Sequence, residues 1–398
     1  MSDLAQMERL GLYVSVPFCR AKCSFCNFAS GVSSAERISA YVRELCAEID
    51  GVAAKAEQIG TRLPRVVDTV YFGGGTPSLL EPEQLREIFA ALRRQFTLQP
   101  GAEITLEAAP EQIADEVLEE ALRLGVNRVS LGVQSFVDRE SAAVGRTHTG
   151  ESCMQEFARL RAAGVREIGA DLIAGLPYQT HESWRMSLEA ACSSEITHLS
   201  VYLLEIDEGS RLGREVLGGG ARLHAPAVAN EELAAEMYEA ACELLPAHGF
   251  EQYEISNFAR GTEHQSRHNR KYWERGPYVG FGLDAHSMLL RGDGSAVRFA
   301  NTKELDDYDA EGFAELNEIA GRDEFEESMF LGLRLNEGLS VQSLRERFPK
   351  EWVRECEERV GELARDGLMC VTDGRWFLTM RGRLVSSEIF GELLAVVA

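Results

Sequence analysis

The stretch Cys19-Arg20-Ala21-Lys22-Cys23-Ser24-Phe25-Cys26 places three cysteines on one short segment of a 398-residue chain. It follows residues 12–16, an alternating apolar run that predicts a strand ending at Pro17. Three thiolates on one loop can hold three corners of a cubane iron–sulfur cluster and leave the fourth iron without a protein ligand. A structural zinc site usually takes four ligands, and no further Cys or His stands close in the sequence. The spacing therefore favours a cluster over zinc or three unrelated buried thiols.

The charge and hydropathy patterns argue against some classes of binding partner. The chain carries 41 basic and 64 acidic residues, a formal charge of −23. Such a surface repels phosphate backbones and anionic lipids, which argues against nucleic-acid or membrane-surface binding. No stretch approaches the ~18 apolar residues of a membrane span, and residues 1–10 lack the basic start and apolar core of a signal peptide. We therefore expect a cytoplasmic protein with reduced thiols.

Strand-like runs alternate with helical stretches in the first half of the chain. The predicted strands are residues 12–16, 66–72, 103–109, 128–134, 167–174 and 198–204. Apolar residues at helical spacing lie between them, for example Ile38, Tyr41, Val42, Leu45 and Ile49. Such alternation implies a parallel sheet covered by helices, and six units are fewer than the eight of a closed barrel. We predict an α/β fold, a partial (β/α)6 barrel similar to a TIM barrel.

The second half of the chain is less regular. Residues 230–245 predict an amphipathic helix, whereas residues 258–299 are rich in Gly, His and aromatics without a clear period. Further on, predicted helices at residues 324–335, 341–347 and 351–366 precede a hairpin around Asp373-Gly374 and a final helix. Helices followed by such a hairpin resemble a winged-helix module. We predict a barrel over residues 1–210, an extension over residues 211–310 and a C-terminal winged-helix-like domain over residues 311–398.

The C-terminal module carries 11 basic and 18 acidic residues from residue 311 onward. A winged helix that reads DNA needs a basic face for the phosphate backbone. The acidic balance therefore favours a packing or lid role for this domain.

Polar residues and glycines follow the predicted strands in series. Gly73-Gly74-Gly75-Thr76-Pro77 ends the second strand, and its glycines let the backbone approach a ligand closely. Glu107, Gln134 and Asp171 stand at the ends of later strands, and Arg146 follows the fourth. Because ligands of parallel barrels bind at the carboxyl ends of the strands, these side chains should converge near the cysteine loop. The acids and the amide suit ribose hydroxyls or an amino group, and the guanidinium suits a carboxylate.

The cysteine spacing resembles that of the radical S-adenosylmethionine (SAM) superfamily. The resemblance implies a [4Fe-4S] cluster on Cys19, Cys23 and Cys26, whose open iron takes the amino and carboxylate groups of SAM. One electron then cleaves the sulfonium to a 5′-deoxyadenosyl radical, while the protein binds and orients the cofactor. It also implies that Phe25 lies against the adenine and that the glycine turn holds the amino group. The residues expected to contact SAM are Tyr13, Phe25, Gly74, Gly75, Thr76, Glu107, Gln134, Arg146 and Asp171.

Motifs along nearly the whole chain resemble the oxygen-independent coproporphyrinogen III oxidase (HemN) family. They are residues 13–28, 73–77, 107–110, 132–136, 145–148, 171–177, 253–258 and 268–273. The resemblance is closest to the heme chaperone branch, HemW. The oxidase branch has a fourth cysteine where Phe28 stands here, and a long N-terminal arm, whereas this cysteine loop begins at residue 19. Both differences favour the chaperone branch.

The segment His268-Asn269-Arg270-Lys271-Tyr272-Trp273 resembles the H-N-x-x-Y-W signature of that branch, which is implicated in heme handling. A neutral imidazole is a natural axial ligand of heme iron, so His268 is the first candidate, with Tyr272 and Trp273 facing the macrocycle. His286 is the second candidate. The alternative is that these residues only pack a loop.

The function expected from the resemblance is binding of heme and its transfer to an acceptor protein. The implied partners are heme, an acceptor such as a membrane-associated respiratory protein, and a reductant protein such as flavodoxin or ferredoxin. No residue is assigned a catalytic role. The first alternative is an enzyme, a coproporphyrinogen III dehydrogenase that starts oxidative decarboxylation by hydrogen abstraction from a propionate. The second is a radical SAM methyltransferase-like enzyme. Phe28 disfavours the first alternative, and the H-N-x-x-Y-W segment disfavours the second.

Overall fold

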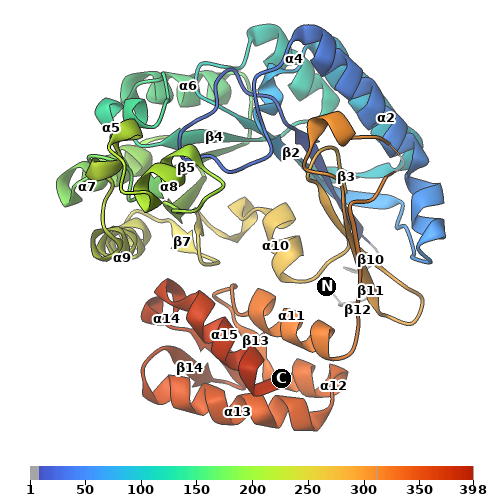
Figure 1. Cartoon of the computed structure of the whole chain (residues 1–398), viewed down its shortest axis with the longest axis vertical. Helices are drawn as coiled ribbons and strands as arrows, with labels where there is room; N and C mark the ends of the chain where they lie inside the picture. Colours follow the sequence, from blue (N-terminus) through green and yellow to red (C-terminus); the bar gives the residue numbers. More distant parts are fainter. Residues whose placement is uncertain (1–8, 311, 398) are drawn as a thin grey trace.

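A computed structural model describes residues 9–310 and 312–397. The N-terminal stretch considered above lies largely outside these ranges, as does residue 311 at a predicted boundary. Within them, the central feature is a parallel sheet that curves into an arc (Figure 1). Its strands are β1 (Arg9–Val16), β2 (Val66–Gly74), β3 (Thr97–Ala108), β4 (Arg128–Gln134), β5 (Glu167–Ala174) and β6 (His198–Leu203). Consecutive strands pair in parallel, which confirms the predicted partial (β/α)6 barrel.

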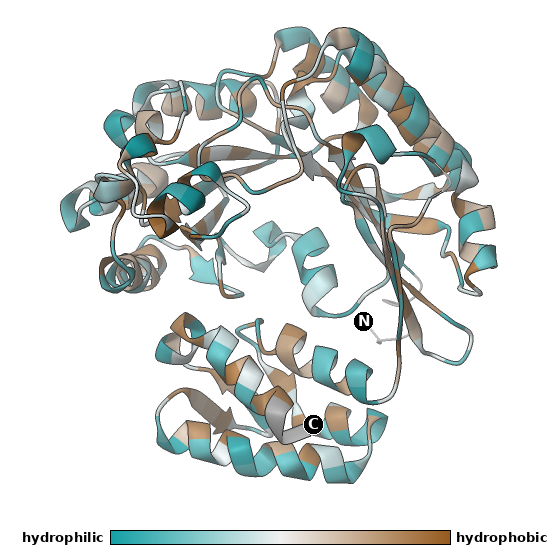
Figure 2. Cartoon of the chain, viewed as in Figure 1, coloured by the Kyte–Doolittle hydropathy of each residue, from teal (hydrophilic) through white to brown (hydrophobic). Residues whose placement is uncertain are grey.

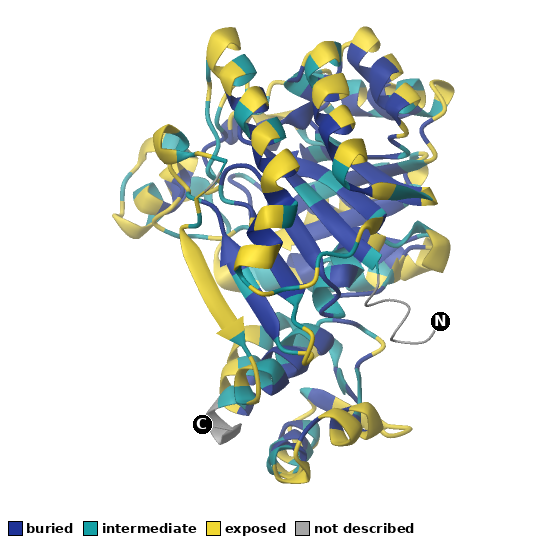
Figure 3. Cartoon of the chain, turned by 90° about the vertical axis from the view of Figure 1, so that its right-hand side faces the viewer, coloured by how far each residue is buried: buried dark blue, intermediate teal, exposed yellow. Residues whose placement is uncertain are grey.

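Helices cover the outer face of the arc. They are α2 (Ala35–Gln58), α3 (Pro82–Gln95), α4 (Asp115–Leu124), α5 (Asp138–Ala143), α6 (Gly150–Ala162) and α7 (His181–Ser193). In α2 the predicted apolar stripe, including Tyr41, Leu45 and Ile49, is buried, and the Ser34 side chain caps the helix by accepting a hydrogen bond from the Arg37 amide. Apolar residues lie on the helix faces toward the sheet (Figure 2), so the sheet is buried beneath helices whose outer faces are exposed (Figure 3).

The sheet continues beyond both ends of the six-strand arc. β9 (Tyr278–Phe281) pairs in parallel with β1, and β10 (His286–Leu290), β11 (Ala296–Ala300) and β12 (Glu315–Ile319) follow in antiparallel pairs. At the other end, β8 (Asn257–Ala259) and β7 (Glu251–Gln252) extend the sheet past β6. The described sheet therefore has twelve strands. Residues 258–299, where the sequence shows no clear period, contain short strands. Strands this brief are too short to produce a recognisable period in the sequence.

Further helices lie between the barrel strands and the C-terminal domain. They are α8 (Arg211–Leu217), α9 (Glu231–Ala247) and α10 (Arg267–Trp273), with 3-10 turns η2 (Arg222–Ala227), η3 (Thr262–His264) and η4 (Leu305–Asp307). Another 3-10 turn, η1 (Pro77–Leu79), follows β2 within the barrel. The helix predicted at residues 230–245 is confirmed as α9, whose first turn is capped by the Asn230 side chain.

The C-terminal domain lies across the open side of the arc (Figure 1). Its elements are α11 (Arg322–Gly332), β13 (Leu339–Ser340), α12 (Val341–Arg347), α13 (Lys350–Arg365), β14 (Met369–Thr372), β15 (Arg375–Leu378), α14 (Met380–Leu384) and α15 (Ser386–Val397). The predicted hairpin is confirmed, and both turn residues, Asp373 and Gly374, have positive φ. The domain has its own core around Phe325, Val353 and Trp376. None of the described helices combines the length and apolar character needed to cross a membrane. The division of the chain at residues 210 and 310 stays a prediction.

Candidate functional site

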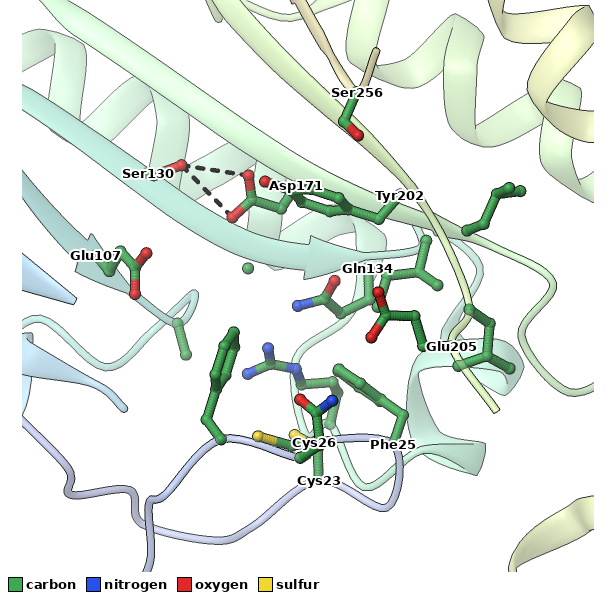
Figure 4. Close-up of a pocket in the computed structure, with 18 of the residues that line it drawn as sticks. Cys23, Phe25, Cys26, Glu107, Ser130, Gln134, Asp171, Tyr202, Glu205 and Ser256 are labelled. Carbon is green, nitrogen blue, oxygen red and sulfur yellow. Dashed lines mark hydrogen bonds between the residues drawn. The ribbon is translucent and has the colours of Figure 1, made fainter. Parts of the chain in front are cut away.

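A cavity of about 750 Å³ opens at the carboxyl ends of the barrel strands. Figure 4 shows the cysteine loop on one side of it and side chains from the strand ends on the other. Eleven of the residues predicted from the sequence line this cavity: Cys19, Cys23, Phe25, Cys26, Gly74, Gly75, Thr76, Glu107, Gln134, Arg146 and Asp171. Tyr13 is not in this lining and borders a second, smaller cavity nearby. The expected convergence at the strand ends is therefore seen for these eleven side chains, which share one cavity.

Hydrogen bonds hold the cysteine loop in place at several points. The Thr76 hydroxyl donates to Cys19 Sγ at 3.6 Å, and the Thr76 amide donates to the Phe18 carbonyl at 2.7 Å. The Ser24 amide donates to the Val144 carbonyl at 3.1 Å. Cys19, Cys23 and Cys26 all have free thiols. Within the described chain, no three His, Cys, Asp or Glu side chains converge on one metal ion. A cubane differs from a single ion because each thiolate binds a different iron, so the loop fits a cluster.

The glycine turn lets the end of β2 lie directly against the cysteine loop. Gly74 has φ +96°, a conformation that side chains other than glycine rarely adopt. A Cβ on Gly75 would come within 2.7 Å of the carbonyl oxygens of Val16 and Phe18. Because these atoms belong to the backbone, the close packing of β1, β2 and the loop requires glycine here.

Gly75→Ala should lower the free energy of unfolding by about 1–3 kcal/mol, since overpacking against backbone forces a shift. It should also lower the amount of cluster bound per chain, because the shifted backbone carries Cys19. Gly51→Ala is a matched control, since a Cβ there meets no other atom within 4 Å. In the middle of α2 that change should raise stability by about 0.5–1 kcal/mol. Urea denaturation and iron analysis measure both effects, and equal stability of the two variants would contradict the packing argument.

Two carboxyl groups face the cavity from β3 and β5. The Tyr71 hydroxyl donates to Glu107 Oε1 at 2.7 Å. The Ser130 hydroxyl lies 3.4 Å and 3.5 Å from the two oxygens of Asp171 (Figure 4). Burial raises the pKa of Glu107 to about 7 and the pKa of Asp171 to about 6. Both acids are therefore poised to ionise when a positive ligand group enters the cavity.

The affinity for SAM should rise as the pH rises toward about 7. Binding of a cationic ligand favours the ionised carboxylates, and below the raised pKa of Glu107 that acid is protonated in the free protein. One proton linked to binding changes the affinity by up to about tenfold per pH unit. Isothermal titration calorimetry of wild type and Glu107→Gln measures this effect. The variant should keep only the slope due to Asp171, which is confined to pH below about 6, and a flat wild-type profile would contradict the linkage.

Arg146 and Gln134 approach the cavity from the end of β4 and the following loop. Arg146 Nε is buried without a hydrogen-bond partner, and no described carboxylate forms an ion pair with this guanidinium. Gln134 has φ +68°, and the register of β4 against β5 shifts between Gly132 and Gln134. A Cβ on Gly132 would lie 2.8 Å from Arg146 Nη2. The bulge and the glycine therefore make room for a guanidinium that suits an anionic ligand group.

The sequence interpretation missed several lining residues. Tyr202 and Glu205 lie at the end of β6, where the rule of polar residues at strand ends could have found them. Arg383 and Ser387 enter the cavity wall from α14 and α15. These two could not be found from local pattern, because only tertiary packing brings the C-terminal domain to the barrel.

The structure places the H-N-x-x-Y-W segment on α10, away from the larger cavity. His268 is 1% exposed. Its Nδ1 lies 2.9 Å from Thr69 Oγ1 and its Nε2 lies 2.7 Å from the Tyr272 hydroxyl, so both ring nitrogens are occupied. Burial lowers the pKa of His268 to about 3, which keeps the ring neutral. Trp273 lies under the Arg334 guanidinium, 4.2 Å from the ring centroid. Tyr272 lines the smaller of these two cavities, and His268 and Trp273 line neither of the two.

Comparisons with known proteins agree with this geometry. Residues 13–191 match the model of the Radical SAM superfamily, and residues 319–385 match the HemN C-terminal domain. The chain is 33% identical to "Heme chaperone HemW" of Bacillus subtilis, over 96% of this chain and 98% of the relative. It is 30% identical to "Heme chaperone HemW" of Lactococcus lactis, over 96% of each. The solved structure of coproporphyrinogen III oxidase (HemN) from Escherichia coli has a TM-score of 0.81 at 24% identity, covering 98% of this chain and 90% of that chain, which shows a shared fold.

The partial barrel with a three-cysteine loop at its mouth is that of a radical SAM protein. The cofactors of this class are a [4Fe-4S] cluster and SAM, and the free thiols, the buried acids and the unpaired guanidinium fit both. Similarity over nearly the full length then narrows the assignment. The chain belongs to the HemW family.

Proposed function

We propose that this protein is a heme chaperone of the cytoplasm: it binds heme, carries a [4Fe-4S] cluster with exchangeable SAM, and transfers heme to an acceptor protein. The observation that carries the proposal is the full-length similarity to two proteins named heme chaperones, at 33% and 30% identity. Phe28 supports it, because this side chain stands where the oxidase branch would have a fourth cysteine, and it lies 63% exposed at the cavity.

Different residues of the larger cavity would bind different parts of the two cofactors. Cys19, Cys23 and Cys26 would hold the cluster. Arg146 would neutralise the carboxylate of SAM, and Glu107 and Asp171 would accept hydrogen bonds from its hydroxyl or amino groups. Phe25, the glycine turn, Thr76 and Gln134 complete the wall. When bound, the reduced cluster and SAM supply one-electron cleavage of the sulfonium.

The surroundings of the cysteine loop favour an acidic reductant. Arg20 and Lys22 belong to the loop and line the cavity, and Arg211 donates to the Lys22 carbonyl at 2.5 Å. These cations gather at one site of a chain whose formal charge is −23. Complementary charge steers association, so an electron donor with an acidic surface, such as flavodoxin or ferredoxin, fits this rim.

The oxidase fold of the HemN neighbour makes porphyrinogen decarboxylation the second candidate. One experiment separates the two functions. The reconstituted protein, with its cluster verified, is incubated anaerobically with dithionite, SAM and coproporphyrinogen III, and the products are read by mass. A parallel sample is titrated with hemin and then mixed with apomyoglobin as a generic acceptor. We expect a saturable heme complex, transfer to apomyoglobin and no loss of carboxyl groups. Formation of protoporphyrinogen would overturn the chaperone proposal.

A further inference from the structure

We infer that heme binds in the second cavity, beside the cysteine pocket, with the His286 imidazole as the axial ligand of its iron. The inference rests on the proposed function, since it places the ligand of that function. It also reverses the order of the two histidines suggested by the sequence, where His268 of the H-N-x-x-Y-W segment comes first.

The second cavity has a lining suited to one part of a tetrapyrrole. It measures about 330 Å³, at the lower end of the range for cofactor pockets. Phe28, Tyr272, Tyr278 and Leu283 give it an aromatic and apolar wall, and His286 is its one histidine. The rings of Tyr272 and Tyr278 form a T-shaped pair with centroids 4.6 Å apart. Flat macrocycles bind against such rings.

His286 is free to bind a metal. Its side chain is 48% exposed, at the start of β10. In the described chain neither ring nitrogen has a hydrogen bond, and the nearest charged group is Asp284, whose Oδ1 lies 3.9 Å from Nε2. A carboxylate beside a ligating imidazole orients the ring and raises its basicity.

The loop before His286 is rigidly anchored. The Leu283 amide donates to the Tyr41 hydroxyl at 2.9 Å, and the Gly282 amide donates to Glu48 Oε2 at 2.8 Å. Tyr41 in turn donates to the Ser15 carbonyl at 2.8 Å. These bonds run from α2 and β1, so the histidine is held at a fixed place relative to the cysteine loop that follows β1.

His268 has a structural role and does not bind the iron. Both its ring nitrogens are bonded, one of them to the Tyr272 hydroxyl at 2.7 Å. The histidine therefore orients Tyr272, which forms the wall of the second cavity. In this arrangement His268 is a positioning residue, and its neutral, buried imidazole holds the cavity wall and does not bind the iron.

The two cavities share a wall. Phe28 and Gly74 line both of them. A cavity of about 330 Å³ leaves part of a bound heme uncovered, which a transfer function needs. Lys303 lies 3.8 Å from Asp284 Oδ1 with its side chain 68% exposed, and so offers a cation near the mouth for a heme propionate.

The test compares His286→Ala with two other histidine variants in the full-length protein. His181→Ala is the matched control, because that histidine is 63% exposed and lines neither cavity. Each variant is titrated with hemin while the Soret band and the spin state of the iron are followed. Circular dichroism and the cluster absorption verify folding.

We expect His286→Ala to lose the histidine-ligated spectrum and at least about tenfold in heme affinity. Added free imidazole should restore the spectrum. His268→Ala should lower the affinity while the Soret position stays that of wild type, and His181→Ala should change neither. An unchanged spectrum in folded His286→Ala, or loss of the ligand signature in His268→Ala alone, would overturn the inference and leave the chaperone function standing. Absence of heme binding by the wild-type protein would overturn both.

Discussion

Cys23→Ala should abolish the visible absorption of the iron–sulfur cluster and reduce bound iron from about four atoms per chain to near zero. Cys23 is the most buried of the three thiols on the loop and lies at the centre of the C-x3-C-x2-C spacing. With one iron already lacking a protein ligand, loss of a second corner leaves two thiolates for four irons. No other cysteine lines the cavity in the described chain, so none can substitute. Anaerobic reconstitution followed by absorption, iron and sulfide analysis measures the effect.

Cys46→Ala provides the matched control for that experiment. Cys46 is half-buried on α2 and lines neither cavity. Burial raises the pKa of its thiol to about 11, so it is protonated at neutral pH. The control should reconstitute as wild type does. A full cluster in Cys23→Ala, or equal loss in both variants, would contradict the assignment of the loop.

Arg146→Ala should weaken SAM binding about 10- to 100-fold, the range for losing hydrogen bonds to a charged group. The guanidinium has no described carboxylate partner, and its Nε is buried without a hydrogen-bond partner. Its charge is therefore available to a ligand carboxylate, and its removal breaks no ion pair that holds the fold together. Isothermal titration calorimetry of the reconstituted protein measures the loss.

Two comparisons make the Arg146 result specific. Arg166→Ala removes an exposed arginine at the opposite end of the barrel, just before β5, and should leave SAM affinity unchanged. Heme affinity of Arg146→Ala should equal that of wild type, because Arg146 does not line the second cavity. Parallel loss of SAM and heme affinity would indicate a general structural defect and refute the assigned role.

The sequence predicts the six parallel strands well because each is bounded by a glycine, a proline or a helical stripe, and each is long enough to be recognised. The strands β7 to β12 escape prediction for two reasons. They are two to five residues long, and the two that join this group to the six-strand arc, β9 and β8, pair with strands far away in the chain. The parallel pairing of β9 with β1, for example, joins residues more than 260 positions apart. Local pattern carries no information about such pairings.

The candidate site also has a part that the sequence predicts and a part that it does not. Cys19, Glu107 and Asp171 stand at strand ends, and the topology alone brings them to one cavity. Whether a given side chain has a free ligand atom depends on its neighbours, which the sequence does not specify. His268 and His286 illustrate this. Both stand near aromatic residues in the sequence, yet both ring nitrogens of His268 are engaged in internal hydrogen bonds. Motif resemblance cannot separate these two cases, because Thr69, one of the two partners of His268, lies on β2, 199 residues away in the chain.

The wall of the larger cavity joins segments that are synthesised at very different times. The cysteine loop, residues 19–30, leaves the ribosome more than 350 residues before Arg383, Leu384 and Ser387, which line the same cavity. During synthesis the loop is therefore exposed on this side until residues 383–387 have been added. A nonsense codon at position 380 would remove this part of the wall and leave the cysteines more open to water and dissolved oxygen.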